Sequence, residues 1–330
     1  MRMDGASVLL ANLTSPIVLA FVLGAIAGFI RSELELPEPV LKLLSIYLLF
    51  SIGLVGGREL SHVTFAEISG LLAVTVALTI AIPVLCFIVL RRLGGFDAAN
   101  AAAVAAHYGS VSSVTFFAAM AFARAASTPA EGYMTAVVAV MEWGVIIALM
   151  LGRWALGREA GSHTLGQLVA DTLRGRGILL LSGGTVIGLL AGDRGWAQIA
   201  PFYEQLFRAI LMLFLLEMGM TAARQVRDFA KVGLFMAGFG VVAPVLFGLL
   251  GVWLGTLAGL GVGGAFVLGA VCASASYIDA PAACRAALPQ ASPGIYLTAS
   301  LGVTFPFNLL LGLPLYYAFA SWLVAGRIAA

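Results

Sequence analysis

Long runs of hydrophobic residues, separated by short polar stretches, follow one another along nearly the whole chain. About 20 apolar residues cross ~30 Å of hydrocarbon as a helix. The runs are too continuous for the alternating pattern of barrel strands, the other structure that satisfies its backbone in lipid. They predict an all-α membrane protein with ten spans, over residues 14–31, 38–57, 67–91, 97–124, 132–153, 176–192, 202–222, 230–258, 262–288 and 294–323.

The composition supports this interpretation and excludes other classes of protein. Hydrophobic residues make up 61% of the chain and charged residues 10%, against ~25% charged residues in soluble domains. We therefore expect an integral protein of the cell (inner) membrane. No basic run suggests nucleic acid, and no enzyme or cofactor signature of the P-loop, HExxH, GxSxG or CxxC type is present. Neither catalysis nor a bound cofactor is expected.

The lysines and arginines predict the orientation of the helices. If the N-terminus lies outside, 12 of the 18 basic residues fall on the cytoplasmic side, where they are enriched in membrane proteins. Both termini are then outside, and the polar connection 154–175 is cytoplasmic. Glu217, near the cytoplasmic end of span seven, is expected to reach water.

The two halves of the chain resemble each other. "GAIAG" at Gly24–Gly28 returns as "GLLAG" at Gly188–Gly192, and "SIGLVGGREL" returns as "EMGMTAARQV". Each half, 1–153 and 176–330, contains five predicted spans. Because five is odd, the second half enters the membrane upside down relative to the first. Such inverted repeats are typical of secondary transporters.

Spans four and nine are interrupted at corresponding positions. The apolar pattern stops at Gly109–Thr115 in span four and at Ala273–Asp279 in span nine, where Pro281 follows. Proline is favoured at the start of a helix, and Ser or Asp before it caps the free N–H groups. The pattern predicts two half-helices on either side of a break near the middle of the membrane, in both repeats. Paired breaks of this kind are the best sequence indication of a transport site.

The ends of half-helices favour ions. An N-terminus carries a partial positive charge and suits an anion, whereas the carbonyls of a C-terminus suit a cation such as Na⁺. Serine and glycine in membrane helices also serve close packing, but two matched clusters favour a site. The expected substrate-binding residues are Gly109, Ser110, Ser112, Ser113, Thr115, Ser274, Ser276 and Tyr277.

Carboxylates within the spans suggest a coupling ion. A carboxylate deep within a membrane span, such as that of Asp279, is expected to have a functional role. The alternative is that Asp279 only caps the following half-helix. Glu142 matches Asn308 in the repeat, and both supply oxygens for cation ligation or a link to the breaks. The Na⁺ candidates are Asp279, Glu142, Asn308, Ser112 and Ser276.

Two other functions are open from the residues alone. Asp279 or Glu142 could carry a proton, which would make the protein a proton-coupled transporter of a small organic anion. The same fold could also serve as a membrane sensor that binds its substrate without transporting it.

At these segments the sequence resembles the sodium-dependent bicarbonate transporters. The similarity is sharpest in "SIGLVGG", "GSVSSVTFFAAM" and the tract Ala273–Phe307. It implies a gate domain made of spans one, two, six and seven, beside a core domain in which spans four and nine cross and hold bicarbonate and Na⁺. It also implies a homotrimer and a PII-like regulatory protein on the cytoplasmic face.

The breaks depart from the pattern of that family. Its bicarbonate-transporting members have Gly in place of Ser113, Ser in place of Val114, Asp in place of Tyr277 and Ser in place of Asp279. The acid has in effect moved two residues along the chain. The departures leave the substrate and the coupling ion open. The connection 154–175 is also shorter than in those members, which leaves the PII-like partner open.

Overall fold

The computed structural model describes residues 5–157, 166, 170, 174–227, 233–278 and 280–329. Within these residues all regular structure is helical. In this described part of the chain, six helices are long and apolar enough to cross a membrane, or seven if the bent pair at the N-terminus counts as one span. The chain is therefore an integral membrane protein. The halves of the two broken spans are each too short to be counted among these helices.

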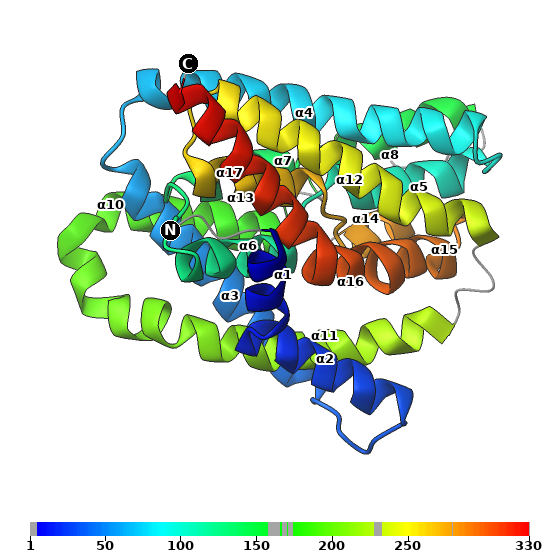
Figure 1. The fold of residues 1–330 in the computed structure, drawn as a ribbon. Helices are drawn as coiled ribbons and strands as arrows, with labels where there is room; N and C mark the ends of the chain where they lie inside the picture. The colour runs from blue at the N-terminus through cyan, green and yellow to red at the C-terminus, as the bar shows by residue number, and fades with distance from the viewer. Residues whose placement is uncertain are drawn as a thin grey trace.

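The described part of the first half contains eight helices, which follow the predicted spans closely from the second span onward. They are α1 (Gly5–Leu13), α2 (Pro16–Phe29), α3 (Glu38–Leu60), α4 (Phe65–Arg92), α5 (Ala98–Gly109), α6 (Ser113–Ala125), α7 (Met134–Met141) and α8 (Gly144–Leu156). Figure 1 shows α4 running along the upper side of the molecule, while α2 lies on the lower side and α3 runs the opposite way, from there toward the upper left.

Helix α1 was not expected from the sequence, which predicted only a first span at 14–31. The two helices are bent by 57° relative to each other. Ser15 caps α2, since its Oγ accepts a hydrogen bond from the N–H of Val18 at 3.3 Å, and Pro16 occupies the first turn, where it costs no hydrogen bond. The side chain of Asn12 joins α1 to a segment near the C-terminus, because its Nδ2 donates to the carbonyl of Leu309 at 2.9 Å.

The described residues of the second half form longer helical runs and three π-helical segments. Its elements are α10 (Arg176–Ala200), η2 (Pro201–Gln205), α11 (Phe207–Arg227), α12 (Gly233–Leu257), α13 (Val262–Cys272), α14 (Ala280–Ala287), α15 (Pro293–Leu297), η4 (Thr298–Thr304), α16 (Phe305–Phe307), η5 (Asn308–Gly312) and α17 (Leu313–Ala329). The sixth span was expected to end at 192, but α10 continues eight residues further. Gly192 bends it at φ 54°, and Figure 1 shows the chain turning back between α10 and α11.

Helices α2, α3, α10 and α11 are joined by glycines that bring backbone against backbone. Gly24 lies against Leu216 and Gly28 against Met220, so α2 and α11 run in the same direction. Gly53 lies against Leu181 in the same way, and Gly57 against Thr185, so α3 and α10 also run in the same direction. Small residues allow such close approach in the absence of a hydrophobic force between helices.

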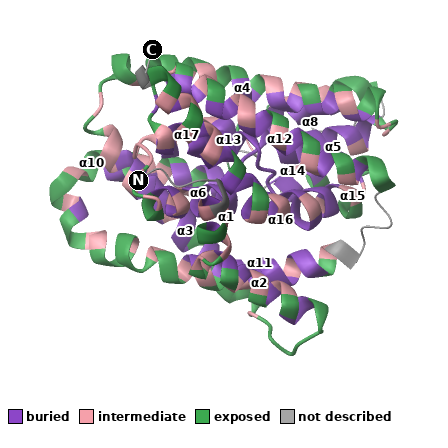
Figure 2. Cartoon of the chain, viewed as in Figure 1, coloured by how far each residue is buried: buried purple, intermediate pink, exposed green. Residues whose placement is uncertain are grey.

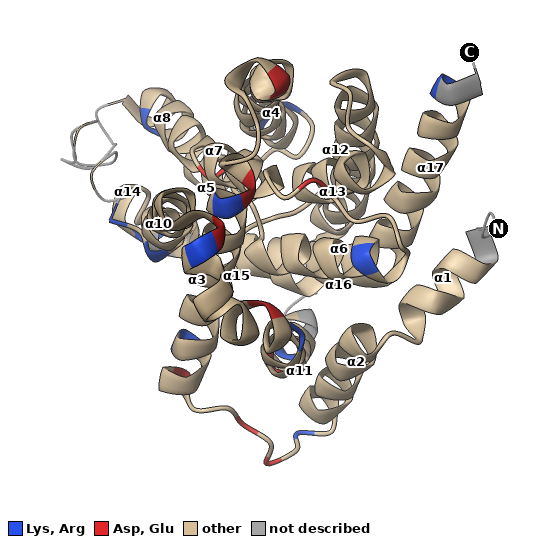
Figure 3. Cartoon of the chain, turned by 90° about the vertical axis from the view of Figure 1, so that its left-hand side faces the viewer, with Lys and Arg blue, Asp and Glu red and all other residues tan. Residues whose placement is uncertain are grey.

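The remaining long helices surround α5 and α13. Residues 98–109 of α5 are buried except for Asn100, and residues 263–272 of α13 are all buried. Figure 2 shows buried residues concentrated around these helices, with exposed residues on the outer faces of α4 and α10. Charged residues are few and lie mostly near helix ends (Figure 3). The two broken spans therefore occupy the centre of the packed interior.

Candidate functional site: two helix breaks in contact

The first break is short and capped by its own serine. Helix α5 ends at Gly109 and α6 begins at Ser113, with Ser110 and Ser112 in extended backbone conformation. The Oγ of Ser112 accepts a hydrogen bond from the N–H of Thr115 at 3.3 Å, which satisfies one of the free N–H groups of the first turn. The interruption is narrower than the predicted Gly109–Thr115, because Ser113 and Thr115 already belong to α6.

The second break is longer. Helix α13 ends at Cys272 and α14 begins at Ala280, one residue before the proline that the sequence placed at its start. Ser274 turns back onto α13, since both its N–H and its Oγ donate to the carbonyl of Val271, at 3.1 and 2.8 Å. Asp279 lies outside the described residues. Of the residues predicted for this side of the site, the structure therefore places Ser274 and Ser276 in the second break, and the position of the Asp279 carboxylate is not described.

The two breaks bind each other directly. The N–H of Ser112 donates to the Oγ of Ser274 at 2.9 Å. In the other direction, the N–H of Ser276 donates to the carbonyl of His107 at 2.7 Å. The interruptions of spans four and nine thus lie in contact, as the crossing of two broken helices requires. Backbone groups that a continuous helix would satisfy internally are here satisfied by the opposite break.

Each break is also held by a polar residue of the fifth span of its own half. The Oγ of Ser110 donates to a carboxylate oxygen of Glu142 at 2.5 Å. The Nδ2 of Asn308 donates to the carbonyl of Ala273 at 2.7 Å, and its Oδ1 accepts from the hydroxyl of Tyr316 at 3.0 Å. Glu142 and Asn308 are both buried, and they lie at different breaks, so the structure gives the link to the breaks that the repeat suggested.

These two residues lie where their helices are irregular. Glu142 lies between α7 and α8, and Asn308 begins the π-helical segment η5. Irregular turns inside membrane helices leave backbone carbonyls available, and π-turns occur frequently at functional sites. Gly144 follows Glu142 and packs against the carbonyl of Gly109. The end of α5 is therefore fixed by close backbone contact as well as by the Ser110 hydrogen bond.

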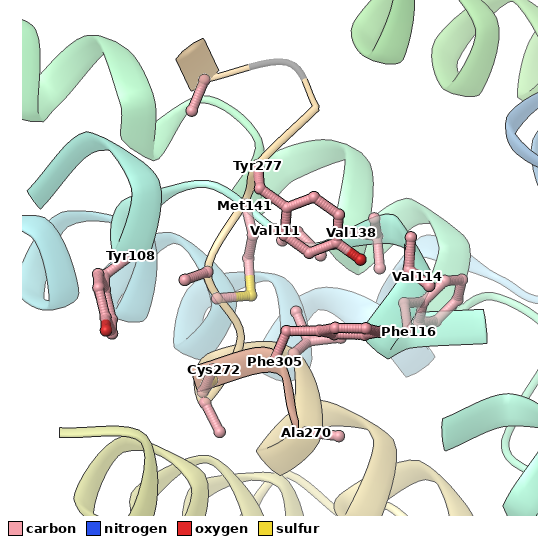
Figure 4. Packing of buried hydrophobic residues seen from close by; sticks show 14 of the residues in the cluster. Tyr108, Val111, Val114, Phe116, Val138, Met141, Ala270, Cys272, Tyr277 and Phe305 are labelled. Carbon is pink, nitrogen blue, oxygen red and sulfur yellow. The ribbon is translucent and has the colours of Figure 1, made fainter. Parts of the chain in front are cut away.

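Tyr277 fills the space beside the breaks with an aromatic ring. Its ring contacts Phe305 with 5.2 Å between centroids, and Phe305 contacts Phe21 of α2 at 5.4 Å. Figure 4 shows the ring among apolar side chains of both breaks. The hydroxyl faces Ser112 but has no hydrogen-bond partner within 3.5 Å among the described residues. Tyr277 thus connects the break of span nine to a helix of the glycine-joined group.

Among the described residues, the polar atoms around the breaks are mostly oxygens, and they do not form the cluster of His, Cys, Asp or Glu side chains that holds a transition metal. Within the described residues, no three His, Cys, Asp or Glu side chains lie together. Thr115 has a buried Oγ1 with no partner among these residues, and Glu142 supplies the carboxylate. Hydroxyl, carbonyl and carboxylate oxygens suit a hard monovalent cation. The N-terminus of α6 suits an anion.

His107 is buried in the last turn of α5. Its Nδ1 lies 2.7 Å from the carbonyl of Ala103, and its ring stacks on Tyr296 at 4.4 Å between centroids. The sequence did not indicate that its carbonyl would hold Ser276. Nor did it indicate Tyr316, whose hydroxyl donates to Asn308. Both roles depend on backbone placement, which residue type does not reveal.

Glu217 differs from expectation. It is 3% exposed instead of reaching water. Its carboxylate accepts hydrogen bonds from the N–H of Leu36 at 3.4 Å and the hydroxyl of Thr221 at 3.2 Å. The segment that joins α2 to α3 folds over it, which the apolar pattern alone could not predict. It lies on the glycine-joined helices and takes no part in the break contacts described above.

Comparison with known proteins gives one family. A family model described as the Na⁺-dependent bicarbonate transporter superfamily matches residues 16–321, which is nearly the whole chain of 330 residues. No curated protein matches the sequence.

Proposed function

Because the chain belongs to the Na⁺-dependent bicarbonate transporter superfamily, we propose that it is a secondary active transporter which moves bicarbonate, or a similar small anion, together with Na⁺. The observation that carries this proposal is the contact between the two breaks, Ser112 to Ser274 and Ser276 to His107. These hydrogen bonds bring the end of α5 and the start of α6 beside the end of α13, and we take this place to lie within the membrane. An anion and a cation could there be bound by peptide groups of opposite polarity.

Ten spans in two inverted repeats are part of the proposal. The helical run Arg176–Gln225 has 50 residues, which is ~75 Å at 1.5 Å per residue and more than twice the thickness of the hydrocarbon. It therefore counts as two spans that meet beyond Gly192. With the bent N-terminal pair and the two broken spans counted once each, the total is ten. Helix α10 runs parallel to α3 and hence opposite to its repeat partner α2, which supports the inversion.

The proposed mechanism is movement of a core domain against a gate domain. The gate is α2, α3, α10 and α11, which are joined by backbone contacts at glycines. The core is formed by spans three, four, five, eight, nine and ten, and it contains both breaks. The ring contacts from Phe21 through Phe305 to Tyr277 join the gate to the site. Alternating access then requires this aromatic contact to break and reform as the core moves.

The proposed roles of the site residues follow from their oxygens and N–H groups. The anion would bind at the N-termini of α6 and α14, with the hydroxyls of Ser112, Ser276 and Thr115. Na⁺ would bind beside Glu142 and Ser110, on the carbonyl side of the first break, with Asp279 as a further candidate. Asn308 already has two hydrogen bonds, and we assign it first to holding the second break.

Transport by purified protein in liposomes tests the proposal. We expect uptake of ¹⁴C-bicarbonate that depends on an inward Na⁺ gradient and is lost when K⁺ replaces Na⁺. Ser112→Ala should reduce the rate at least tenfold, while Ser45→Ala, at a buried serine of α3, should leave it unchanged. Uptake driven by a pH gradient without Na⁺ would favour the proton-coupled organic-anion alternative. Binding of bicarbonate without flux would favour the sensor.

The assembly and the regulation stay predictions. The resemblance implies a homotrimer and a PII-like partner on the cytoplasmic face. The distribution of the basic residues implies that both termini lie outside the cell. Native mass spectrometry of the purified protein tests the trimer. To test the orientation, cysteines are introduced at the two termini of the protein and labelled in intact cells.

A further inference from the structure

A cavity of about 310 Å³ lies between the gate and the core, away from the breaks. Its walls come from the bend between α1 and α2, from α6, from the start of α11 and from the junction of η5 and α17. Figure 3 shows α6 facing α1 and α2 across this part of the molecule. Because α2 and α11 are gate helices and α6 belongs to the core, the cavity lies along the seam where the two proposed domains meet.

The chemistry of the walls is almost entirely apolar. Ile17, Val18, Phe122, Met212 and Leu313 line it, together with alanines of α6. An engineered apolar cavity of ~150 Å³ stays dry and takes up benzene. A cavity of twice that volume, inside a protein whose surroundings are lipid, favours an alkyl chain over water.

Two of the three polar side chains in the walls already have partners. The Nδ2 of Asn12 donates to the carbonyl of Leu309 at 2.9 Å, and the Oγ of Ser15 accepts from the N–H of Val18. Arg208 is the third. It is exposed at the start of α11, and it has no carboxylate within 4 Å among the described residues, including Glu204 one turn before it.

We infer that this cavity binds a single-chain anionic amphiphile, a fatty carboxylate, with its alkyl chain between α6 and the α1–α2 bend and its head group on Arg208. A guanidinium binds a carboxylate with two parallel hydrogen bonds. The volume suits one chain. Under the function proposed above, a bound chain would wedge the gate against the core and slow transport.

Laurate is a suitable probe, with methyl laurate as the uncharged control. Binding to the purified full-length protein is measured by the rise of its unfolding temperature with laurate concentration. We expect a saturable rise with laurate and none with the ester. Arg208→Gln should weaken binding about tenfold or more, through loss of the charged hydrogen bonds. Arg194→Gln, an exposed arginine outside the cavity, is the matched control and should bind as the unchanged protein does.

A second variant tests the alkyl-chain part without touching the charge. Ala125→Phe fills the cavity from its exposed rim and should also abolish binding. Equal laurate binding by Arg208→Gln, Ala125→Phe and the unchanged protein would overturn the site. Displacement of laurate by low amounts of dioleoylphosphatidylglycerol would overturn the single-chain assignment in favour of a phospholipid.

Uptake in liposomes separates this inference from the proposed function. Laurate should lower Na⁺-driven bicarbonate uptake by the unchanged protein and leave uptake by Arg208→Gln unaffected. Laurate binding without any change in uptake would overturn the wedge. Absence of bicarbonate uptake under all gradients, with laurate binding intact, would contradict the proposed function and keep the site.

Discussion

The backbone N–H of Ser112 donates a hydrogen bond to the Oγ of Ser274, 162 residues later in the chain. The same hydroxyl donates to the carbonyl of Val271. One serine side chain therefore satisfies a free amide of the first break while it closes the end of the helix before the second. Few other groups of this size can both accept and donate at such short range.

Replacement of Ser274 by alanine should destabilise the protein. The N–H of Ser112 would remain buried without a partner, which costs about 1–3 kcal/mol. The measurement is thermal unfolding of the purified protein in detergent. Ser45→Ala is the matched control, because Ser45 has a buried Oγ without a partner among the described residues. Equal unfolding temperatures for both variants would contradict the assigned role of Ser274.

Replacement of Asn308 separates a structural role from ion ligation. Asn308→Asp removes the donor to the carbonyl of Ala273, so we expect a loss of about 1–3 kcal/mol in the free energy of unfolding. Tyr316→Phe removes only the second hydrogen bond and should cost about 1 kcal/mol. If Asn308 served chiefly as a Na⁺ ligand, the added carboxylate would instead tighten Na⁺ binding and leave stability unchanged.

Glu142→Gln should change the response to sodium and retain the fold. The amide oxygen of Gln still accepts the hydrogen bond from Ser110, but the negative charge is lost. We expect the Na⁺ concentration for half-maximal uptake to rise about tenfold or more, which corresponds to ~1.4 kcal/mol or more of ion binding. Glu217→Gln, a second buried carboxylate away from the breaks, is the control. Identical sodium dependence in both variants would remove Glu142 from the cation site.

The hydroxyl and the ring of Tyr277 should have separate effects, the hydroxyl on anion transport and the ring on stability. Tyr277→Phe keeps the contact with Phe305 and removes the hydroxyl that faces Ser112, so stability should be unchanged while the KM for the anion alters. Tyr277→Ala leaves a void in the core, which typically costs 3–5 kcal/mol for a large aromatic residue. Unfolding temperatures and uptake kinetics of the two variants measure both effects. A Phe variant with unaltered uptake would exclude the hydroxyl from the substrate site.

The stability that Asp97 gives to the start of α5 should depend on pH. Its carboxylate accepts a hydrogen bond from the N–H of Asn100 at 2.9 Å. Burial acts to raise its pKa, but the hydrogen bonds from Asn100 and from the backbone outweigh this and hold the pKa of Asp97 below its ordinary 3.8. A carboxyl group with a lowered pKa stabilises the folded state above its unfolded pKa, and the effect disappears as the pH falls through the folded pKa.

Asp97→Ala should therefore cost about 0.5–1 kcal/mol at pH 7, at the low end for a helix cap because the residue is exposed. The difference between the two proteins should shrink below pH 3.8. Thermal unfolding of both proteins across this range measures it. A difference that stays constant down to pH 3 would show that the charge of Asp97 contributes nothing.

The sequence predicted the breaks because their signals are local. Ser112 is a helix cap by residue type, and Pro281 marks a helix start within one residue of its place. The contact between the breaks was expected from the family resemblance, which implies that spans four and nine cross. The partners of Glu142 and Asn308 were predicted only as a link to the breaks, because residue type does not tell which oxygen meets which donor.

The features that the sequence missed depend on distant contacts. Asn12, in the last turn of helix α1, donates to a carbonyl 297 residues away. No periodicity in the sequence distinguishes the π-helical segments of the described residues from ordinary helix. The place of Tyr277 depends on Phe305 and Phe21, which come from two other helices. In each case the decisive interaction joins segments whose separation in the chain gives no signal.

The glycines that join α2 to α11 and α3 to α10 restrict how this protein can evolve. At Gly24, Gly57, Gly188 and Gly219 a methyl group would meet main-chain atoms of the neighbouring helix. Main-chain atoms cannot rotate aside as a side chain does, so even alanine would push two whole helices apart. On the exposed faces of these four helices one apolar residue can replace another with little consequence. Sequence drift is therefore free over most of their surface and blocked at these points.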